Sequence, residues 1–213
     1  LDIGSYCVCF ETAKLLPWNF DYFVPFTTTN LETNWAVKHK ILKQFPYLTK
    51  MLEDKYNQKF IAMQGFDDYG LGTVKQWQKA SELKGVKVIA AGPNLPWVSL
   101  FGSIPVTSTL PTMYNDLATG VAKGVIIFPS AHAGGFKFYE QAPYWKVIGF
   151  GAMAQTITTI NLDTLKKLPP EVAKIIMEEA QNYEKAAIKD GQQRYQKGLT
   201  DLVKLGKKKG IND

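Results

Sequence analysis

Apolar positions along this chain fall into short unbroken runs, separated by longer segments in which they recur at helical spacing. Short apolar runs bounded by Gly, Pro or polar residues are typical of buried strands. Strands are therefore predicted within residues 3–10, 59–66, 82–93, 104–109, 124–128 and 154–160. Helices are predicted over residues 31–45, 46–56, 95–101, 111–119, 136–144 and 163–206. Strands that alternate with helices in this way indicate an α/β fold built from βαβ units around a mostly parallel sheet.

Turn and cap residues mark the ends of several of these elements. The TTTN sequence at 27–30 offers an N-cap for the helix that follows, and Pro46 ends that helix because proline lacks a backbone donor. Two prolines argue against a helix in the aromatic segment 15–26. The segment 67–81 is rich in glycine and polar residues, so it is expected to be a loop.

Composition places the chain among ordinary globular proteins. It has 213 residues, of which 46% are apolar, 17 are glycine and 11 are proline. These values exclude collagen-like and low-complexity disordered chains. A chain of this length can bury a core without disulfides or metals, and it suggests one or two domains.

The charge narrows the class of partner. The net charge is +6, and of the 25 basic residues only Arg194 is an arginine. Proteins that read nucleic acid normally use several arginines at phosphates and base edges, so no nucleic-acid partner is expected. The three lysines at 207–209 are interpreted as a solvated helix face and a frayed tail.

The two cysteines carry no metal or redox motif. Cys7 and Cys9 lie two residues apart in the first apolar run, so in a strand they point the same way and cannot bridge each other comfortably. With no second pair and no nearby histidine they do not form a zinc site. We expect them to be buried and structural, with pocket lining as the alternative.

The usual catalytic motifs are absent from the sequence, which lacks a phosphate-binding loop, a nucleophile elbow and a zinc-protease pair. His39 lies between two lysines and is expected to be solvated. His132 follows a buried strand, where ligands often bind in α/β folds, although a structural or merely exposed role is the simpler interpretation. Asp67 and Asp68 follow the strand at 59–66 and could face a cleft, but no partner for acid–base chemistry is evident.

No stretch is long and apolar enough to cross a membrane. The best candidate, 147–160, is short and is interrupted by Gln155 and threonines. The chain begins with leucine inside an apparent strand, so we expect a trimmed or partial chain.

Seven short segments along the chain form an ordered set of motifs. They are DIG at 2–4, VPF at 24–26, ELKGVKVIAAGP at 82–93, GSIPV at 102–106, MYNDLATGVAKG at 113–124, FKFYE at 136–140 and LKKLPPEVA at 165–173. In order and spacing they resemble the motifs of DctP-type substrate-binding proteins of TRAP (tripartite ATP-independent periplasmic) transporters. In that family the motifs read "DLKGLKIR", "GANPVP", "EVYTALQTGVVDG", "AKFYEV" and "LPPEVQ", and "DIG" and "LPF" occur upstream. The resemblance covers essentially the whole chain.

The resemblance implies a two-lobed, periplasmic-binding-protein-like (type II) α/β fold with a ligand cleft between the lobes and a long C-terminal helix. Lobe I would comprise residues 1–66 and 155–194, and lobe II residues 67–154 and 195–213. About two strand–helix units before the first strand, and a segment after the last helix, would be missing.

The implied function is capture of a small organic ligand outside the cytoplasm, in the periplasm, and its delivery to membrane-embedded TRAP transporter subunits. The lobes would close over the ligand by a population shift, without covalent chemistry and without a cofactor or metal. We expect a monomer.

The chain departs from the family at the positions that read the ligand. The family's arginine in "GLKIR" aligns with Ile89, and a second frequent arginine falls near Tyr69. The glutamate of "EVY" corresponds to Thr112, and the asparagine after "VVDG" falls near Phe128. Because isoleucine cannot pair with a carboxylate, we hypothesise that the usual arginine clamp is absent.

The ligand would then be neutral, aromatic, or a carboxylate held by lysine, hydroxyls and helix N-termini. An apolar or stacking pocket would use aromatic side chains, with a core role as the alternative for Trp18. The candidate ligand-binding residues are Trp18, Asp68, Tyr69, Ile89, Trp97, Thr112 and Phe128.

Two other functions stay open at this stage. One is an enzyme on the same two-lobed scaffold that uses Asp67 or Asp68 with His132. The other is a receptor that has lost its small ligand and serves as a sensing or interaction module.

Overall fold

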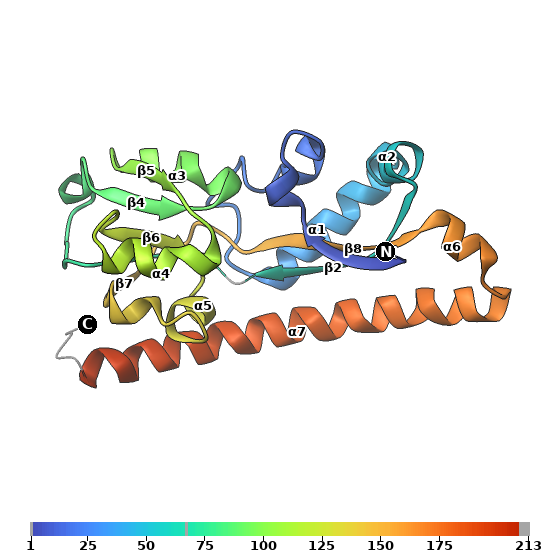
Figure 1. The fold of residues 1–213 in the computed structure, drawn as a ribbon. Helices are drawn as coiled ribbons and strands as arrows, with labels where there is room; N and C mark the ends of the chain where they lie inside the picture. Colours follow the sequence, from blue (N-terminus) through green and yellow to red (C-terminus); the bar gives the residue numbers. More distant parts are fainter. Residues whose placement is uncertain (1, 67, 209–213) are drawn as a thin grey trace.

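The computed structural model describes residues 2–66 and 68–208 of the chain. The described residues form two separate β-sheets, joined by two extended segments, and one long helix runs alongside both sheets (Figure 1). Each sheet has its own hydrophobic core.

The smaller sheet has three strands in the order β1-β8-β2, and both pairings are antiparallel. Its members are β1 (Ile3–Cys7), β2 (Gln58–Phe66) and β8 (Met153–Asn161). Helices α1 (Leu31–Gln44) and α2 (Tyr47–Tyr56) pack on one face through a cluster that includes Met63 and Ile157. The long helix covers the other face, so the central strand β8 is buried on both sides.

The larger sheet has five strands in the order β5-β4-β6-β3-β7. They are β3 (Gly70–Thr73), β4 (Lys87–Ala90), β5 (Ile104–Thr107), β6 (Gly124–Ile127) and β7 (Tyr144–Val147). Strand β4 runs parallel to β5 and β6, whereas β3 runs antiparallel to β6 and β7. Short helices α3 (Leu95–Ser99), α4 (Leu110–Ala118) and α5 (Pro129–Ala133) connect these strands.

The prediction of a mostly parallel sheet is wrong, because only the pairings of β4 are parallel among the described strands. The error arises from β3 and β7. Strand β3, with the sequence GLGT, lies in the segment 67–81, which was expected to be a loop. Strand β7 begins at the last residue of the segment 136–144, which was expected to be helical. The segment 136–144 instead holds a 3-10 turn at Phe138–Glu140, preceded by Lys137 in the left-handed conformation.

The helix starts follow the sequence signals. The Asn30 side chain accepts a 2.8 Å hydrogen bond from the amide of Thr33 and so caps α1, which ends just before Pro46. Helix α6 (Leu162–Lys167) is capped in the same way by Asn161. None of the described helices is both long and apolar enough to span a membrane.

The long helix α7 (Pro170–Lys208) contacts both sheets' layers (Figure 1). Near its middle, the Glu184 carboxylate accepts a 2.8 Å hydrogen bond from the amide of Met63 in β2 and lies 3.0 Å from His39 Nε2. His39 is therefore a bridge from α1 to α7, not the solvated side chain expected. Further along, Gly198 approaches α5 so closely that a Cβ there would lie 2.6 Å from the amide nitrogen of Ser130.

The expectation that Cys7 and Cys9 cannot bridge each other comfortably is also wrong, because they form a disulfide with their Cα atoms 5.3 Å apart. Strand β1 ends at Cys7, and a 3-10 turn over Val8–Glu11 follows at once. The chain therefore coils between the two sulfurs, and the strand geometry that would hold them apart does not apply.

Candidate functional site

Two chain segments cross between the sheets and lie side by side. One follows β2 and contains Asp68 and Tyr69, and the other, residues 148–152, leads into β8. The Asp68 carboxyl Oδ1 accepts a 2.8 Å hydrogen bond from the amide of Gly151, and the amide of Tyr69 donates to the Gly151 carbonyl at 3.4 Å. Gly151 has φ +124°, a conformation that favours glycine. The crossing is thus a two-stranded connection between the sheets.

Asp68 is almost completely buried in this crossing. Burial raises the pKa of its carboxyl to about 6, and the hydrogen bonds from the amides of Gly151 and Tyr69 offset only part of that effect. The Asp68 carboxyl therefore connects two backbone segments, and its own charge changes near pH 6.

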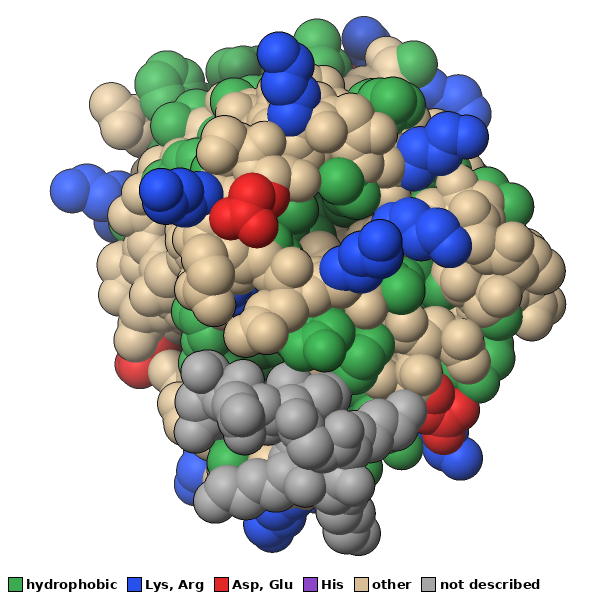
Figure 2. Space-filling model, turned by 90° about the vertical axis from the view of Figure 1, so that its left-hand side faces the viewer, with side chains coloured by type: hydrophobic (Ala, Val, Ile, Leu, Met, Phe, Trp, Pro, Cys, Tyr) green, Lys and Arg blue, Asp and Glu red, His purple; other side chains and the backbone are tan. Residues whose placement is uncertain are grey.

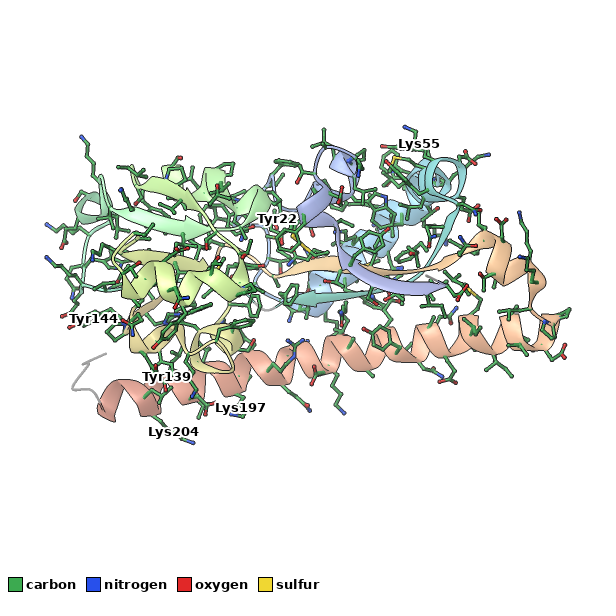
Figure 3. The ribbon with its side chains drawn as sticks, viewed as in Figure 1. Tyr22, Lys55, Tyr139, Tyr144, Lys197 and Lys204 are labelled. Carbon is green, nitrogen blue, oxygen red and sulfur yellow. A yellow bond between two sulfur atoms is a disulfide. The ribbon has the colours of Figure 1, made fainter. Side chains whose placement is uncertain are left out.

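A cavity of about 70 Å³ lies beside the crossing. Its walls come from the carboxyl ends of β1, β2, β4 and β6, from the start of α4 and from β8. Figure 3 labels one wall residue, Tyr22, between the two halves of the molecule. Ligands of open α/β sheets commonly bind at the carboxyl ends of strands, so this position makes the cavity the candidate site.

Aromatic rings form much of the wall. The rings of Phe66 and Phe128 stack with centroids 4.7 Å apart, and Tyr69 meets Phe128 edge-on at 5.6 Å. Phe10, which is 62% exposed, lies on the wall as well and so marks the side that opens to solvent. Such an arrangement suits a compact ligand with an apolar face.

The rest of the apolar wall comes from aliphatic side chains and from the disulfide of Cys7 and Cys9. The aliphatic members are Ala91, Leu110, Met113, Ile126 and Ile127. The disulfide therefore contributes to the site, and one alternative considered for these cysteines, pocket lining, agrees with their position.

The polar wall residues are all uncharged. Gln155 Nε2 donates a 3.1 Å hydrogen bond to the Tyr69 hydroxyl, but Gln155 Oε1 has no partner among the described residues. Asn94 Oδ1 is likewise buried without a partner. Burial, and next the neighbouring Tyr69 hydroxyl, raises the pKa of Tyr22 well above its usual value, so Tyr22 is a neutral phenol.

A second hollow, an open groove of about 580 Å³, lies at the far end of the five-stranded sheet. Its border includes Lys75, Lys87 and Lys123 with Glu82. Lysine side chains are spread over this end of the molecule with few acidic ones among them (Figure 2). The lysine side chains at this end of the five-stranded sheet thus lie at the surface, whereas the described residues that line the cavity include no lysine, arginine or histidine.

Residues 12–210 match the family of bacterial extracellular solute-binding proteins, family 7, also called DctP. The chain belongs to this family. A search of the curated proteins finds no match to this chain.

Solved structures of DctP solute receptors share the fold. DctP7 of Bordetella pertussis, an extracytoplasmic solute receptor that binds pyroglutamic acid, is 19% identical, with a TM-score of 0.82 over 96% of this chain and 66% of that one. DctP6 of the same organism, also a pyroglutamic acid receptor, is 19% identical, with a TM-score of 0.81 over 95% of this chain and 65% of that one.

A TRAP periplasmic solute-binding protein of Xanthobacter autotrophicus with bound β-D-galacturonate is 15% identical, with a TM-score of 0.78 over 97% of this chain and 68% of that one. This chain thus spans slightly less than two thirds of the two Bordetella receptors. The two-lobed fold of DctP proteins, with the long C-terminal helix, is that of this chain.

The structure brings two of the residues aligned with the DctP ligand readers to the cavity, Tyr69 and Phe128. Trp97 packs behind them, edge-on to Tyr69 at 5.7 Å, and its Nε1 donates a 2.9 Å hydrogen bond to the carbonyl of Tyr22. Asp68 lies next to Tyr69 in the crossing and does not border the cavity.

Three other candidate residues lie away from the cavity wall. Ile89 is fully buried in the centre of β4, and Ala91, two residues along the chain, borders the cavity instead. Thr112 accepts from the Thr109 amide in the first turn of α4 and is exposed. Trp18 is buried between β2 and α2, where its Nε1 donates to the Leu48 carbonyl at 3.1 Å, so the core alternative describes its position.

The histidine suggested for an enzyme lies in the core and is not among the residues that line the cavity. His132 is completely buried, and its Nε2 lies 2.9 Å from the carbonyl of Ala142, which can only accept, so Nε2 carries the proton. Burial lowers the pKa of His132 to about 3. Asp67 lies outside the described residues, and among those described no cluster of His, Cys, Asp or Glu could hold a metal ion.

Sequence reasoning missed Asn94 and Gln155, whereas Tyr22 belongs to the aromatic segment 18–26 that was expected to contribute to the pocket. A weak signal existed for Gln155, which interrupts a long apolar run, and for Asn94, which follows a Gly-Pro turn at the end of a buried strand. Both positions match the rule that ligands bind beyond the carboxyl ends of strands.

Proposed function

We propose that this chain is the solute receptor of a TRAP-type transporter, which captures one small organic molecule in the cavity between its two sheets. The cavity carries the proposal, since it lies at the junction of the two sheets, beyond the carboxyl ends of several strands, and aromatic and aliphatic side chains line it. Membership of the DctP family and the likeness to solved solute receptors support it.

We propose that lobe I, residues 1–66 and 155–194, and lobe II, residues 67–154 and 195–213, close over the solute by moving at the crossing segments. The supporting observation is that both segments cross from one sheet to the other side by side, joined by hydrogen bonds of Asp68 and Tyr69 to Gly151. Closure would exclude water from the cavity, and a solute that contacts both lobes would shift the population towards the closed form.

The receptor would act outside the cytoplasm, in the periplasm, as a monomer that delivers the solute to membrane-embedded TRAP subunits. It would bind the solute without covalent chemistry, cofactor or metal. Bound organic acids in the similar structures make an organic acid one candidate, and the apolar, uncharged cavity makes an aromatic or neutral compound the other.

Thermal denaturation of refolded, solute-free protein in the presence of a library of organic acids and neutral cyclic compounds tests this function. A receptor is expected to show a rise in melting temperature with at least one compound. Mass spectrometry of that compound after incubation with the protein should show it unchanged. Ala91→Leu, which fills the cavity, should abolish the rise, whereas Ala118→Leu, on the exposed face of α4, should keep it.

Two results would contradict the proposal. One is the absence of stabilisation by every compound. The other is recovery of a converted product, which would favour an enzyme on the same scaffold.

A further inference from the structure

The segment that forms the five-stranded sheet, residues 69–152, carries a surplus of positive charge. It contains seven lysines, no arginine and three acidic residues. All ion pairs between described residues lie outside this segment. The lysines of the segment therefore have no carboxylate partner among the described residues. They are Lys75, Lys79, Lys84, Lys87, Lys123, Lys137 and Lys146.

The acidic side chains of this segment are bonded to uncharged groups. Glu82 Oε1 accepts a 2.8 Å hydrogen bond from the backbone amide of Lys79. Asp116 Oδ2 accepts a 2.6 Å hydrogen bond from the hydroxyl of Ser108, and Glu140 Oε2 accepts one from a tyrosine hydroxyl. These carboxylates thus stabilise local turns and contacts, and the charge of the lysines faces solvent.

Most of these lysines gather at one end of the five-stranded sheet, around the open groove. Lys75 follows β3, Lys87 begins β4 and Lys123 directly precedes β6, and all three are exposed on the groove border. Lys146 Nζ lies 5.0 Å from the centre of the Trp77 ring, which also borders the groove. Figure 2 shows lysine side chains spread over this end. The term lysine end is used below for Lys75, Lys84, Lys87, Lys123 and Lys146.

Exposed apolar side chains lie beside the lysine end. Val121 is exposed and follows Gly120, which borders the groove. Ile104 is also exposed, and its amide donates a 2.9 Å hydrogen bond to the carbonyl of Val86 on the same border. Lysines with apolar side chains between them are typical of surfaces that bind the headgroup layer of an anionic bilayer.

The residue type discriminates between anionic partners. Recognition of a carboxylate or phosphate at a fixed position favours arginine, whose planar fork donates two parallel hydrogen bonds. Lysine is a compact point charge that requires no fixed geometry, and each lysine near an anionic bilayer adds to the attraction. Several lysines from different strands, with no arginine among them, therefore favour a lipid surface over an acidic protein.

We propose that the lysine end is a docking surface for an anionic lipid bilayer. The ammonium groups face the lipid phosphates, and the side chains of Val121 and Ile104 contact the headgroup layer. The cavity lies at the carboxyl ends of β4 and β6, whereas the lysine end lies at their amino ends, so docking leaves the cavity uncovered. This inference goes beyond solute capture and does not depend on which solute binds.

Co-sedimentation with lipid vesicles tests the inference. We expect the protein to bind vesicles of phosphatidylglycerol and phosphatidylcholine in equal parts, and not vesicles of phosphatidylcholine alone. Raising NaCl from about 0.05 M to about 0.5 M should release the protein, because salt screens exposed charges. No binding to the anionic vesicles, equal binding to both kinds, or binding that salt does not weaken overturns the inference.

A triple variant locates the contact. Replacing three lysines of the groove border by glutamine should weaken binding to the anionic vesicles by about tenfold or more. The substitutions are Lys75→Gln, Lys87→Gln and Lys123→Gln. All three side chains are exposed and unpaired among the described residues, so the variant is expected to fold.

A second triple variant is the matched control for net charge. Lys40→Gln, Lys50→Gln and Lys55→Gln remove the same charge from exposed positions on α1 and α2. Lys55 lies at the opposite end of the molecule (Figure 3). This control should weaken vesicle binding by less than about threefold. Equal losses in the two triple variants overturn the inference, because net charge alone would then explain binding.

Lysine acetylation of the unmodified protein, measured by mass spectrometry, tests the same surface without any variant. Anionic vesicles should slow acetylation of Lys75, Lys87 and Lys123 by about threefold or more, and leave that of Lys55 unchanged. Equal protection of Lys55 overturns the inference.

The alternative partner and the receptor function give different results. Binding of soluble poly-L-glutamate through the lysine end, without binding to vesicles, overturns the inference in favour of an acidic protein. A protein that ignores vesicles but is stabilised by a library compound contradicts the lipid surface and keeps the receptor function. A protein that binds anionic vesicles through the lysine end but no compound supports the lipid surface and contradicts the receptor function.

Discussion

The Asp68 carboxyl accepts a 2.8 Å hydrogen bond from the Gly151 amide, 83 residues further along the chain. This contact joins the segment that leaves the three-stranded sheet to the segment that returns to it. The contact therefore links the two segments that connect the sheets.

Asp68→Asn is expected to change the pH dependence of stability. The pKa of Asp68 in the folded protein, about 6, lies above the ordinary value of 3.8, so folding favours the protonated carboxyl. The stability from Asp68 is therefore present in acid and lost as the pH rises through about 6. Asparagine stays neutral and can still accept from Gly151. Its melting temperature should exceed that of the unmodified protein near neutral pH and match it in acid. Equal differences at both pH values would contradict this.

His132→Gln is expected to change the pH dependence of stability in the opposite direction, with its effect in acid. The folded-state pKa of His132, about 3, lies below the ordinary value of 6.5, because burial disfavours the imidazolium. Its stability contribution is present above pH 6.5 and is lost as the pH falls towards 3. Glutamine can donate to Ala142 without this penalty. Melting curves from neutral to acidic pH should show a smaller loss in the variant, and a parallel loss would refute the assignment.

Lys38→Met is expected to destabilise the protein by about 3–5 kcal/mol. Lys38 Nζ lies 3.1 Å from Asp21 Oδ2, and both side chains are buried, so the substitution leaves an unpaired carboxylate in the core. Denaturant unfolding measures the change. The double variant Lys38→Met with Asp21→Leu should regain most of the loss, and Lys40→Met, which is exposed, should change stability by less than about 0.5 kcal/mol.

Gly198→Ala is expected to weaken the packing of α7 on α5. Alanine favours helix by about 0.5–1 kcal/mol, but its Cβ would meet the backbone of Pro129 and Ser130, which cannot rotate aside. A net loss of about 1 kcal/mol or more is expected in urea unfolding. Gly191→Ala meets the end of the Leu31 side chain, so its loss should be smaller. The reverse order would contradict this account of the packing.

Local sequence signals predicted the elements that local forces determine. Asn30 caps α1 and the proline at 46 ends it, because caps and prolines act on the adjacent backbone. Strand β3 was missed because its Gly-rich sequence carries no strand pattern, and it is fixed by β6 and β7 on either side. The Cys7–Cys9 disulfide was missed because the end of β1 at Cys7 is not evident from an apolar run.

The same distinction applies to the candidate site, because some of its residues were predicted from the sequence and others were missed. Tyr69 and Phe128 were found because the family resemblance aligned them with ligand-reading positions. Asn94 and Gln155 carried only weak sequence signals and were not found, because their place on the wall depends on how segments from both sheets meet.

The most direct measurement is a crystal structure of the protein saturated with the solute that stabilises it most. We expect electron density for that solute in the cavity, in contact with Tyr69 and Phe128. Density for the solute in the lysine-bordered groove, or elsewhere on the surface with the cavity unfilled, would contradict the account.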